Sequence, residues 1–125
     1  FIDIFFWREK AYIVPHGNNR YLIVIDLETR NMSEIKLMRE KQEKCLVAFL
    51  GAVQINNHIF LAESTENILI KFDVDNNDIN IMNIKGYELE GAYPKVFENE
   101  IWFVPVNSKK NILLFNEKFN CFKEK

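Results

Sequence analysis

The sequence predicts an all-β domain built from three similar units, each made of four short strands. One apolar phrase occurs three times in the 125 residues, at Ala11–Pro15, Ile59–Glu63 and Ile101–Pro105. A second apolar run that ends in Asp or Asn follows every phrase, and polar turns separate the runs. Runs this short, rich in β-branched and aromatic residues and bounded by turns, indicate strands rather than helices.

The first strand of each unit is a short apolar run that leads into a tight polar turn. The predicted first strands are Asp3–Trp7, Gly51–Ile55 and Tyr93–Phe97. The turns that follow them are Arg8–Lys10, Asn56–His58 and Glu98–Glu100. Asn tolerates a positive φ, so Asn-rich turns between apolar runs predict antiparallel hairpins.

The second and third strands of each unit are almost continuously apolar. The second strands are the repeated phrases, and the third strands are Tyr21–Asp26, Ile68–Asp73 and Ile112–Asn116. A strand with one wet face alternates apolar and polar side chains, so continuous runs predict that both faces are covered. The fourth strands are Met32–Leu37, Ile79–Ile84 and the segment from Phe122 onwards. The first of these alternates, which is typical of a half-exposed outer edge strand.

The repeated apolar segments begin at residues 11, 59 and 101, one in each unit of four strands. This spacing matches the repeat length of β-propeller blades. We therefore expect a single propeller segment over residues 1–125. Its four-stranded antiparallel blades are predicted at approximately 1–37, 49–84 and 91–125.

The units resemble the kelch-like and YVTN-like blades of bacterial β-propellers. The segment Tyr21–Asn31 is similar to the turn of YVTN-type and quinoprotein-like blades, in which an apolar run is followed by Asp and then Thr. The resemblance covers all three units, but its motifs are loose. The sequence lacks the double glycine of kelch repeats, the Trp-Asp pair of WD40 repeats and the aspartate box of sialidases. Heavy use of Ile, Asn and Lys suggests an AT-rich bacterial genome.

Three blades are fewer than the four to eight that close a propeller. The two terminal faces are then expected to be apolar patches of a kind that monomers avoid. Either further blades of a longer polypeptide complete the ring, or two chains self-associate and each supplies half of a six-bladed ring. We favour the missing blades, because the sequence starts at Phe1 rather than Met and its last unit ends abruptly.

Composition and charge argue against several classes of function. The formal net charge is −2 with acids and bases well mixed, so no nucleic-acid partner is expected. The apolar runs are far shorter than the roughly 20 residues that span a membrane. Cys45 and Cys121 show no metal-ligand spacing, and we expect no metal and no cofactor. The two thiols favour a cytoplasmic location without establishing it, and whether they pair stays open.

The loops between second and third strands lie on one rim of a propeller, where ligands of this family commonly bind. These loops are polar here, at residues 16–20, 64–67 and 106–110, although polar loops are also ordinary solvated turns. Glu63 stands where the other two phrases have Pro. The candidate ligand-binding residues are His16, Asn18, Asn19, Arg20, Glu63, Ser64, Glu66, Asn107, Lys109 and Lys110.

We expect a non-catalytic binding or scaffold module that recognises a protein or peptide through these rim loops. We assign no catalytic residue, because His16 and His58 fall on opposite rims and no nucleophile motif is present. The alternatives are a propeller that binds carbohydrate or another small ligand, and part of a propeller enzyme. The first lacks a Trp or Tyr in the rim loops, and the second needs Glu63, His16 and another acid to cluster.

Overall fold

The computed structural model describes residues 3–15, 19–37, 49–107, 109–118 and 120–125. Within them the chain forms twelve strands and no helix, which confirms the predicted all-β class. The first sheet contains β1 (Ile4–Trp7), β2 (Lys10–Ile13), β3 (Tyr21–Asp26) and β4 (Met32–Lys36). The second contains β5 (Phe49–Ile55), β6 (His58–Glu63), β7 (Ile68–Asp73) and β8 (Ile79–Asn83). The third contains β9 (Ala92–Phe97), β10 (Glu100–Pro105), β11 (Leu113–Asn116) and β12 (Cys121–Glu124).

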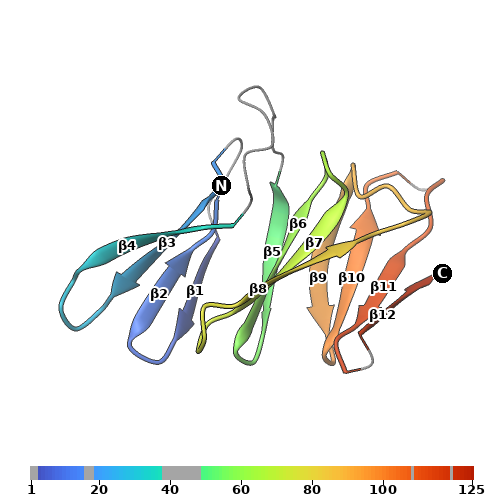
Figure 1. The fold of residues 1–125 in the computed structure, drawn as a ribbon. Coiled ribbons are helices and arrows are strands. Elements are labelled where there is room, and N and C mark those ends of the chain that lie inside the picture. The colour runs from blue at the N-terminus through green and yellow to red at the C-terminus, as the bar shows by residue number, and fades with distance from the viewer. Residues whose placement is uncertain (1–2, 16–18, 38–48, 108, 119) are drawn as a thin grey trace.

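All three sheets are antiparallel, and their strands pair in chain order. They stand side by side in the order in which the chain makes them (Figure 1). The hairpin turns that join the first and second strands contain residues at positive φ, namely Arg8 at 55°, Asn56 at 52°, Glu98 at 47° and Asn99 at 64°. The predicted three units of four antiparallel strands are therefore present. The predicted tight turns join the first and second strands of each unit.

Two hydrophobic cores join the sheets, and the second sheet contributes to both. Tyr12, Leu22 and Val24 of the first sheet lie in one core with residues from β6 and β7. Phe103 and Phe115 of the third sheet lie in the other core with residues from the opposite face of the same two strands. Every residue of β6 except His58 is buried as a result. The continuous apolar runs predict that both faces of the central strands are covered. Within the described residues this prediction holds only for the second sheet.

The first and third sheets each keep one face uncovered within the described chain. Strand pairing places Ile4, Phe6, Ile13, Ile23, Ile25 and Met32 on one side of the first sheet, which we call the first open face. Pairing likewise places Tyr93, Lys95, Phe97, Trp102, Val104 and Leu114 on one side of the third sheet, the third open face. Met32 is 67% exposed and Phe97 is 58% exposed. The expected apolar terminal faces are therefore present.

The three sheets do not close into a ring over the described residues, as Figure 1 shows. The connection between the first and second sheets, residues 38–48 with Cys45, lies outside those residues, and Cys121 is an exposed free thiol. No helix in the described parts of the chain is long and apolar enough to cross a membrane.

The connection between the second and third sheets is held by the side chain of Asn67. Its Nδ2 donates hydrogen bonds to the carbonyl oxygens of Ile84 at 2.9 Å and Tyr87 at 2.6 Å. Its Oδ1 accepts a hydrogen bond from the amide of Leu89 at 2.7 Å. A single turn residue thereby fixes the path of the chain from β8 to β9.

Candidate ligand groove

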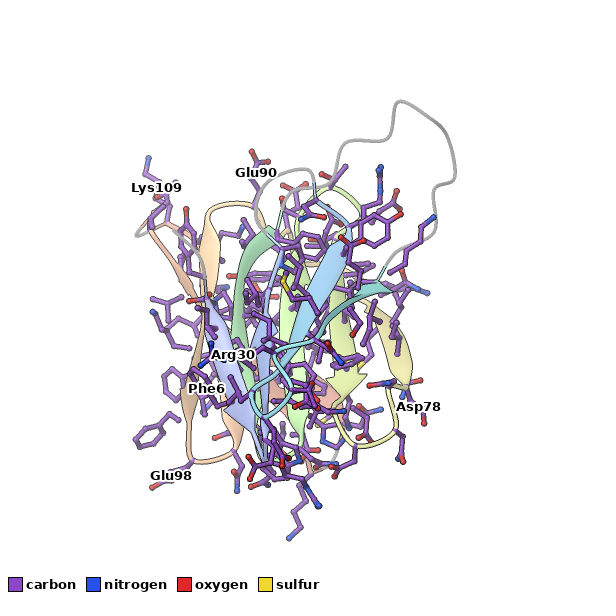
Figure 2. All side chains as sticks on the ribbon, turned by 90° about the vertical axis from the view of Figure 1, so that its left-hand side faces the viewer. Phe6, Arg30, Asp78, Glu90, Glu98 and Lys109 are labelled. Carbon is purple, nitrogen blue, oxygen red and sulfur yellow. The ribbon has the colours of Figure 1, made fainter. Side chains whose placement is uncertain are left out.

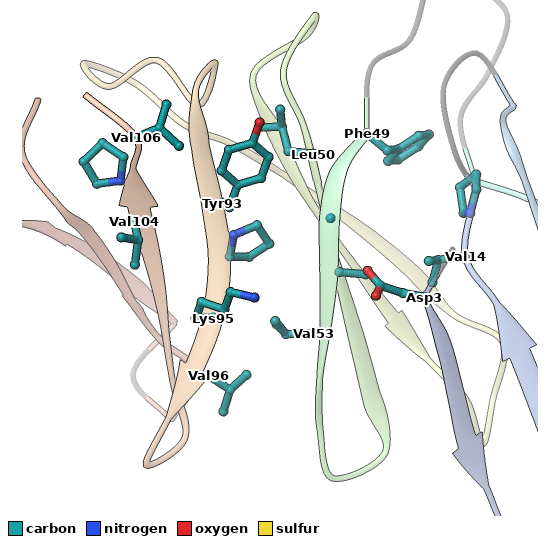
Figure 3. Close-up of a pocket in the computed structure, with 15 residues that line it drawn as sticks. Asp3, Val14, Phe49, Leu50, Val53, Tyr93, Lys95, Val96, Val104 and Val106 are labelled. Carbon is teal, nitrogen blue, oxygen red and sulfur yellow. The ribbon is translucent and has the colours of Figure 1, made fainter. Parts of the chain in front are cut away.

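A groove that could hold a ligand lies beside the first strands of the sheets. It has a volume of about 810 Å³ and is lined by β5, β9, the end of β10 and the ends of the β1–β2 hairpin. Figure 3 shows Tyr93 and Lys95 on the β9 side and Phe49 and Leu50 on β5. β5 and β9 are edge strands in the described sheets, so each has one side without a strand partner. Such an edge presents backbone N–H and C=O groups to any molecule that enters the groove.

A bulge in β5 shapes the groove at Gly51. The pairing of β5 with β6 shifts register between Phe49 and Gly51, and Gly51 has a φ of 156°. A Cβ at this position would lie 3.4 Å from Cδ of Pro94, so β9 packs directly against the bulge. A bulge adds a residue to one strand and bends it. The bend and the close approach of Pro94 place β5 and β9 on two walls of the same groove.

The groove is mainly apolar, with one acid and one base among its lining residues. Asp3 lies at the start of the first sheet, where its carbonyl oxygen accepts a hydrogen bond from the amide of Val14 at 3.1 Å. Lys95 projects from β9 and is exposed. Figure 3 draws Asp3 and Lys95 on opposite sides of β5. An apolar channel with opposite charges at two points can orient a ligand as well as bind it.

The predicted rim residues that the structure describes lie on or next to the loops between the second and third strands of the sheets. Figure 2 shows Lys109 at one end of the sheets and Glu98 at the opposite end. Asn19 and Glu66 are exposed, whereas Arg20 and Ser64 are half-buried. The Oδ1 of Asn19 accepts a hydrogen bond from the amide of Tyr21 at 3.0 Å, so this side chain also closes its own turn. His16 and Asn18 lie outside the described residues.

The third rim loop is tied to the connection between the second and third sheets. Nζ of Lys110 donates a hydrogen bond to the carbonyl oxygen of Glu90 at 2.7 Å and lies 4.9 Å from the ring centre of Tyr87. Oδ1 of Asn107 accepts a hydrogen bond from the amide of Lys109 at 3.0 Å. Lys109 itself is exposed. Lys110 thus has a structural role in this loop, whereas Lys109 is exposed on the rim.

The buried carboxylate of Glu63 closes the turn after β6. Its two oxygens accept hydrogen bonds from the amides of Thr65 and Glu66, both at 2.7 Å, and its exposed fraction is 0%. A carboxylate that accepts backbone hydrogen bonds at a chain reversal organises the turn, as the side chain of an Asx turn does. The departure from Pro at this position therefore has a local structural explanation.

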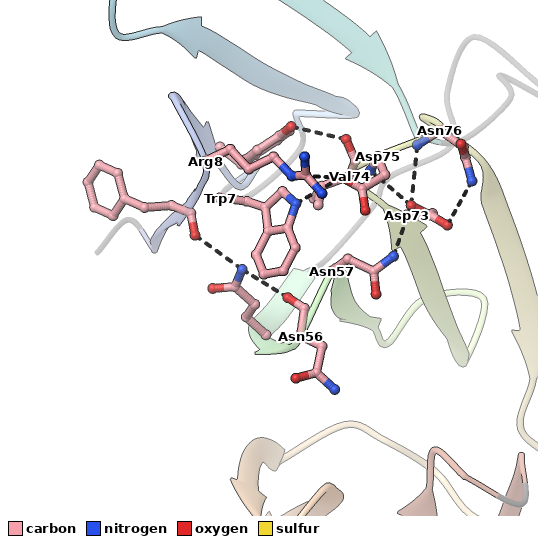
Figure 4. Close-up of polar contacts among 11 residues, drawn as sticks. Trp7, Arg8, Asn56, Asn57, Asp73, Val74, Asp75 and Asn76 are labelled. Atoms are coloured by element: carbon pink, nitrogen blue, oxygen red, sulfur yellow. Dashed lines mark hydrogen bonds and ion pairs between the residues drawn. The ribbon is translucent and has the colours of Figure 1, made fainter.

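A polar cluster occupies the opposite end of the molecule, where the sequence indicated only turns. Figure 4 shows Trp7 and Arg8 of the first sheet against Asp75 of the second. Nε1 of Trp7 donates a hydrogen bond to Oδ1 of Asp75 at 2.9 Å, and Nε of Arg8 lies 3.4 Å from the same oxygen. Between the second and third sheets, Glu117 lies 3.4 Å from Nζ of Lys71 and 3.7 Å from Nδ1 of His58. These contacts link neighbouring sheets.

Asp73 lies at the centre of this end and has a lowered pKa. Desolvation by burial raises the pKa of Asp73, but hydrogen bonds from the amides of Asp75 and Asn76 and the nearby His58 lower it below the ordinary value. Its Oδ1 accepts these amide hydrogen bonds at 2.9 and 3.3 Å. Asp73 caps the turn after β7, so its carboxylate serves the fold. None of the described residues form a group of three or more side chains suited to holding a metal ion.

None of the residues that line the groove is among the candidate ligand-binding residues predicted from the sequence, and Tyr93 and Lys95 are two of the lining residues that the prediction missed. Both residues fall in the predicted first strand Tyr93–Phe97. The signal that could have found them is Pro94 between them. Proline cannot donate to a strand ladder and is confined to edge strands, so it marks β9 as an edge whose neighbouring side chains are accessible.

Comparison with known proteins adds no relative. No protein-family model matches the sequence, and no curated protein matches it either. A function must therefore be inferred from the groove, the rim and the sheets themselves.

Proposed function

We propose that this chain is a segment of a kelch-like or YVTN-like β-propeller that acts as a binding module for a protein or peptide. The observation that supports this function is the groove of about 810 Å³ along the open edges of β5 and β9. In a propeller the first strand of each blade lines the central channel, which is the place that β1, β5 and β9 would occupy. We propose no catalytic step and no cofactor for this module.

The ligand that fits best is an extended peptide with apolar side chains. Lining residues such as Val53, Pro94 and Val106 offer apolar contacts, and the unpaired strand edges offer hydrogen bonds to a peptide backbone. Lys95 suits an acidic side chain of the peptide, and Asp3 suits a basic one. Lys109 and Glu66 are exposed on the rim, and we assign them contacts with residues of the ligand outside the groove.

Peptide selection followed by a charge-reversal variant tests this function. Twelve-residue peptides displayed on phage are selected against the immobilised 125-residue chain, and their affinities are measured by fluorescence anisotropy. Lys95→Glu is expected to weaken peptides that contain an acidic residue by at least about tenfold, or about 1.4 kcal/mol. Lys85→Glu makes the same change of charge at an exposed position outside the groove, and should change affinity less than twofold.

The outcome also shows whether the ligand binds in the groove or on the rim loops, and whether it is a peptide or a carbohydrate. A loss of affinity in Lys109→Glu alone would assign binding to the rim loops that the sequence indicated. Failure to select any peptide, or equal affinity of Lys95→Glu and the wild type, would overturn the peptide proposal.

Tyr93 is 43% exposed in the groove and offers a ring on which a sugar can stack, which favours carbohydrate as the second candidate. Glycan-array binding that is lost in Tyr93→Ala would support that candidate instead.

A further inference from the structure

The two open faces are counterparts of surfaces that pack against each other inside the molecule. Tyr12 of β2 and Phe60 of β6 occupy the same position in their units, and each points toward the sheet that follows. Their exposed fractions are 2% and 0%. Trp102 occupies this position in the third unit, but it lies on the third open face. Its Nε1 has no hydrogen-bond partner among the described residues.

The opposite sides of the sheets show the same relation. Leu61 and Phe103 occupy equivalent positions, point toward the preceding sheet, and are 1% and 0% exposed. Their counterpart in the first unit is Ile13, which is only half-buried on the first open face. Ile23 and Ile25 complete that face at positions whose counterparts in the other units are buried. The first open face therefore has the chemistry of a surface that receives a preceding sheet.

The sequence alone favours missing blades, but the matching chemistry of the two open faces supports the alternative, and we propose that the third open face of one copy of this chain docks on the first open face of a second copy. The contact repeats the head-to-tail packing of the two internal junctions, so neither surface needs a new kind of partner. A heterologous contact of this kind forms a closed ring when its rotation closes. Two copies supply six sheets, which lies within the four to eight that close a propeller. Tyr93, Lys95 and Val104 line the groove and also lie on the third open face, so docking of a second copy and peptide binding compete for this part of the surface.

One pair of opposite charges on the outermost strands of the two faces agrees with this arrangement. Lys123 lies on β12, the outermost strand of the third sheet, in the row of side chains that includes Leu114. Glu34 lies on β4, the outermost strand of the first sheet, in the row that includes Ile23. Head-to-tail packing brings these two outer strands together, so Lys123 of one copy approaches Glu34 of the other.

An ion pair also links the two neighbouring sheets at each internal junction. Nζ of Lys71 in the second sheet lies 3.4 Å from Oε1 of Glu117 in the third. Nε of Arg8 in the first sheet lies 3.4 Å from Oδ1 of Asp75 in the second. In both junctions the earlier sheet supplies the cation and the later sheet supplies the acid. Lys123 and Glu34 continue this order across the proposed contact.

The molar mass of the intact chain in solution tests the proposal. Light scattering coupled to gel filtration is expected to give about 30 kDa, twice the 14.9 kDa of one chain. Phe6→Glu on the first open face and Val104→Glu on the third should each yield monomers with an unchanged circular dichroism spectrum, because both side chains are more than 40% exposed. Ile81→Glu is the matched control, since Ile81 is 50% exposed on β8 of the second sheet, and it should remain a dimer.

Mixing and charge exchange distinguish head-to-tail packing from other pairings. A mixture of Phe6→Glu and Val104→Glu retains one intact contact and should form a heterodimer. Glu34→Lys and Lys123→Glu should each weaken the dimer, and the double variant should restore it. A monomeric wild-type chain would overturn the proposal and leave the faces to sheets of a longer polypeptide. A dimer that survives either Phe6→Glu or Val104→Glu would overturn it as well, because one face would then pair with itself.

Discussion

At the scale of single residues, Asn67 shows how one side chain orders the connection between two sheets. It has a φ of 57°, which Asn adopts more readily than other residues with a Cβ. Its amide group uses both donor hydrogens and the acceptor oxygen on Ile84, Tyr87 and Leu89. Leu89 is fully buried, so its amide has no water to replace the lost acceptor.

Replacing Asn67 with Ala should therefore destabilise the protein by about 2–4 kcal/mol, because backbone groups of the connection lose their partners. Urea denaturation followed by tryptophan fluorescence measures the change. Asn77→Ala is the matched control, since Asn77 has a similar φ of 59° but is exposed in the turn after β7. The control should cost only about 1 kcal/mol, the conformational part of the effect. Equal losses in the two variants would show that the side-chain hydrogen bonds of Asn67 contribute nothing.

At the scale of elements, the turns after the third strands of the first and second sheets share one device. Asp26 and Asp73 both end a third strand, and the side chain of each accepts backbone hydrogen bonds from the turn that follows. The pKa of Asp26 is lowered, first by the amide of Thr29, and the pKa of Asp73 is lowered as described above. A group whose folded pKa is below its unfolded value stabilises the fold when it is ionised.

The stabilisation by Asp73 should thus be complete above its unfolded pKa of about 3.9 and be lost as the pH falls through the lower folded pKa. Asp73→Asn should destabilise the protein by about 1 kcal/mol at pH 7, and the difference from the wild type should shrink between about pH 4 and pH 2. Urea denaturation at several pH values measures both quantities. Asp78→Asn, at an exposed position in the same turn, is the control and should change the stability at pH 7 by less than about 0.5 kcal/mol. A difference that persists at pH 2 would contradict the assignment.

The positions of the strands could be predicted from the sequence more fully than the existence of the groove. Local patterns determine the strands: the run Ile68–Asp73 was expected at the bounds that β7 has. The rim loops were also local features and could be listed, but their contacts could not, because Lys110 reaches Glu90 and Tyr87 only through the packing of two sheets. The groove depends on how far apart β5 and β9 lie. That spacing follows from the bulge at Gly51 and its contact with Pro94, which no periodicity records.

At the scale of the whole molecule, the three sheets are unequal although their sequences are similar. The second sheet has a neighbour on each side, whereas the first and third have one each within the described chain. In an array where each unit contacts only its neighbours, stability is a sum of unit and interface terms. The second sheet therefore takes part in two interfaces and the others in one. Local opening should begin at the two ends of the array.

Hydrogen exchange followed by mass spectrometry should reveal this order. At chain concentrations low enough to keep copies apart, peptides from β6 and β7 should exchange at least about tenfold more slowly than those from β2 and β3, which corresponds to about 1.4 kcal/mol. The comparison is matched, since the paired strands have the same place in their sheets and differ in the number of covered faces. At higher concentration, head-to-tail association should slow β2, β3, β10 and β11 and leave β6 and β7 nearly unchanged, because only the outer sheets gain a neighbour. Equal protection of all three sheets at low concentration would mean that the chain opens as one cooperative unit, and it would contradict the nearest-neighbour description.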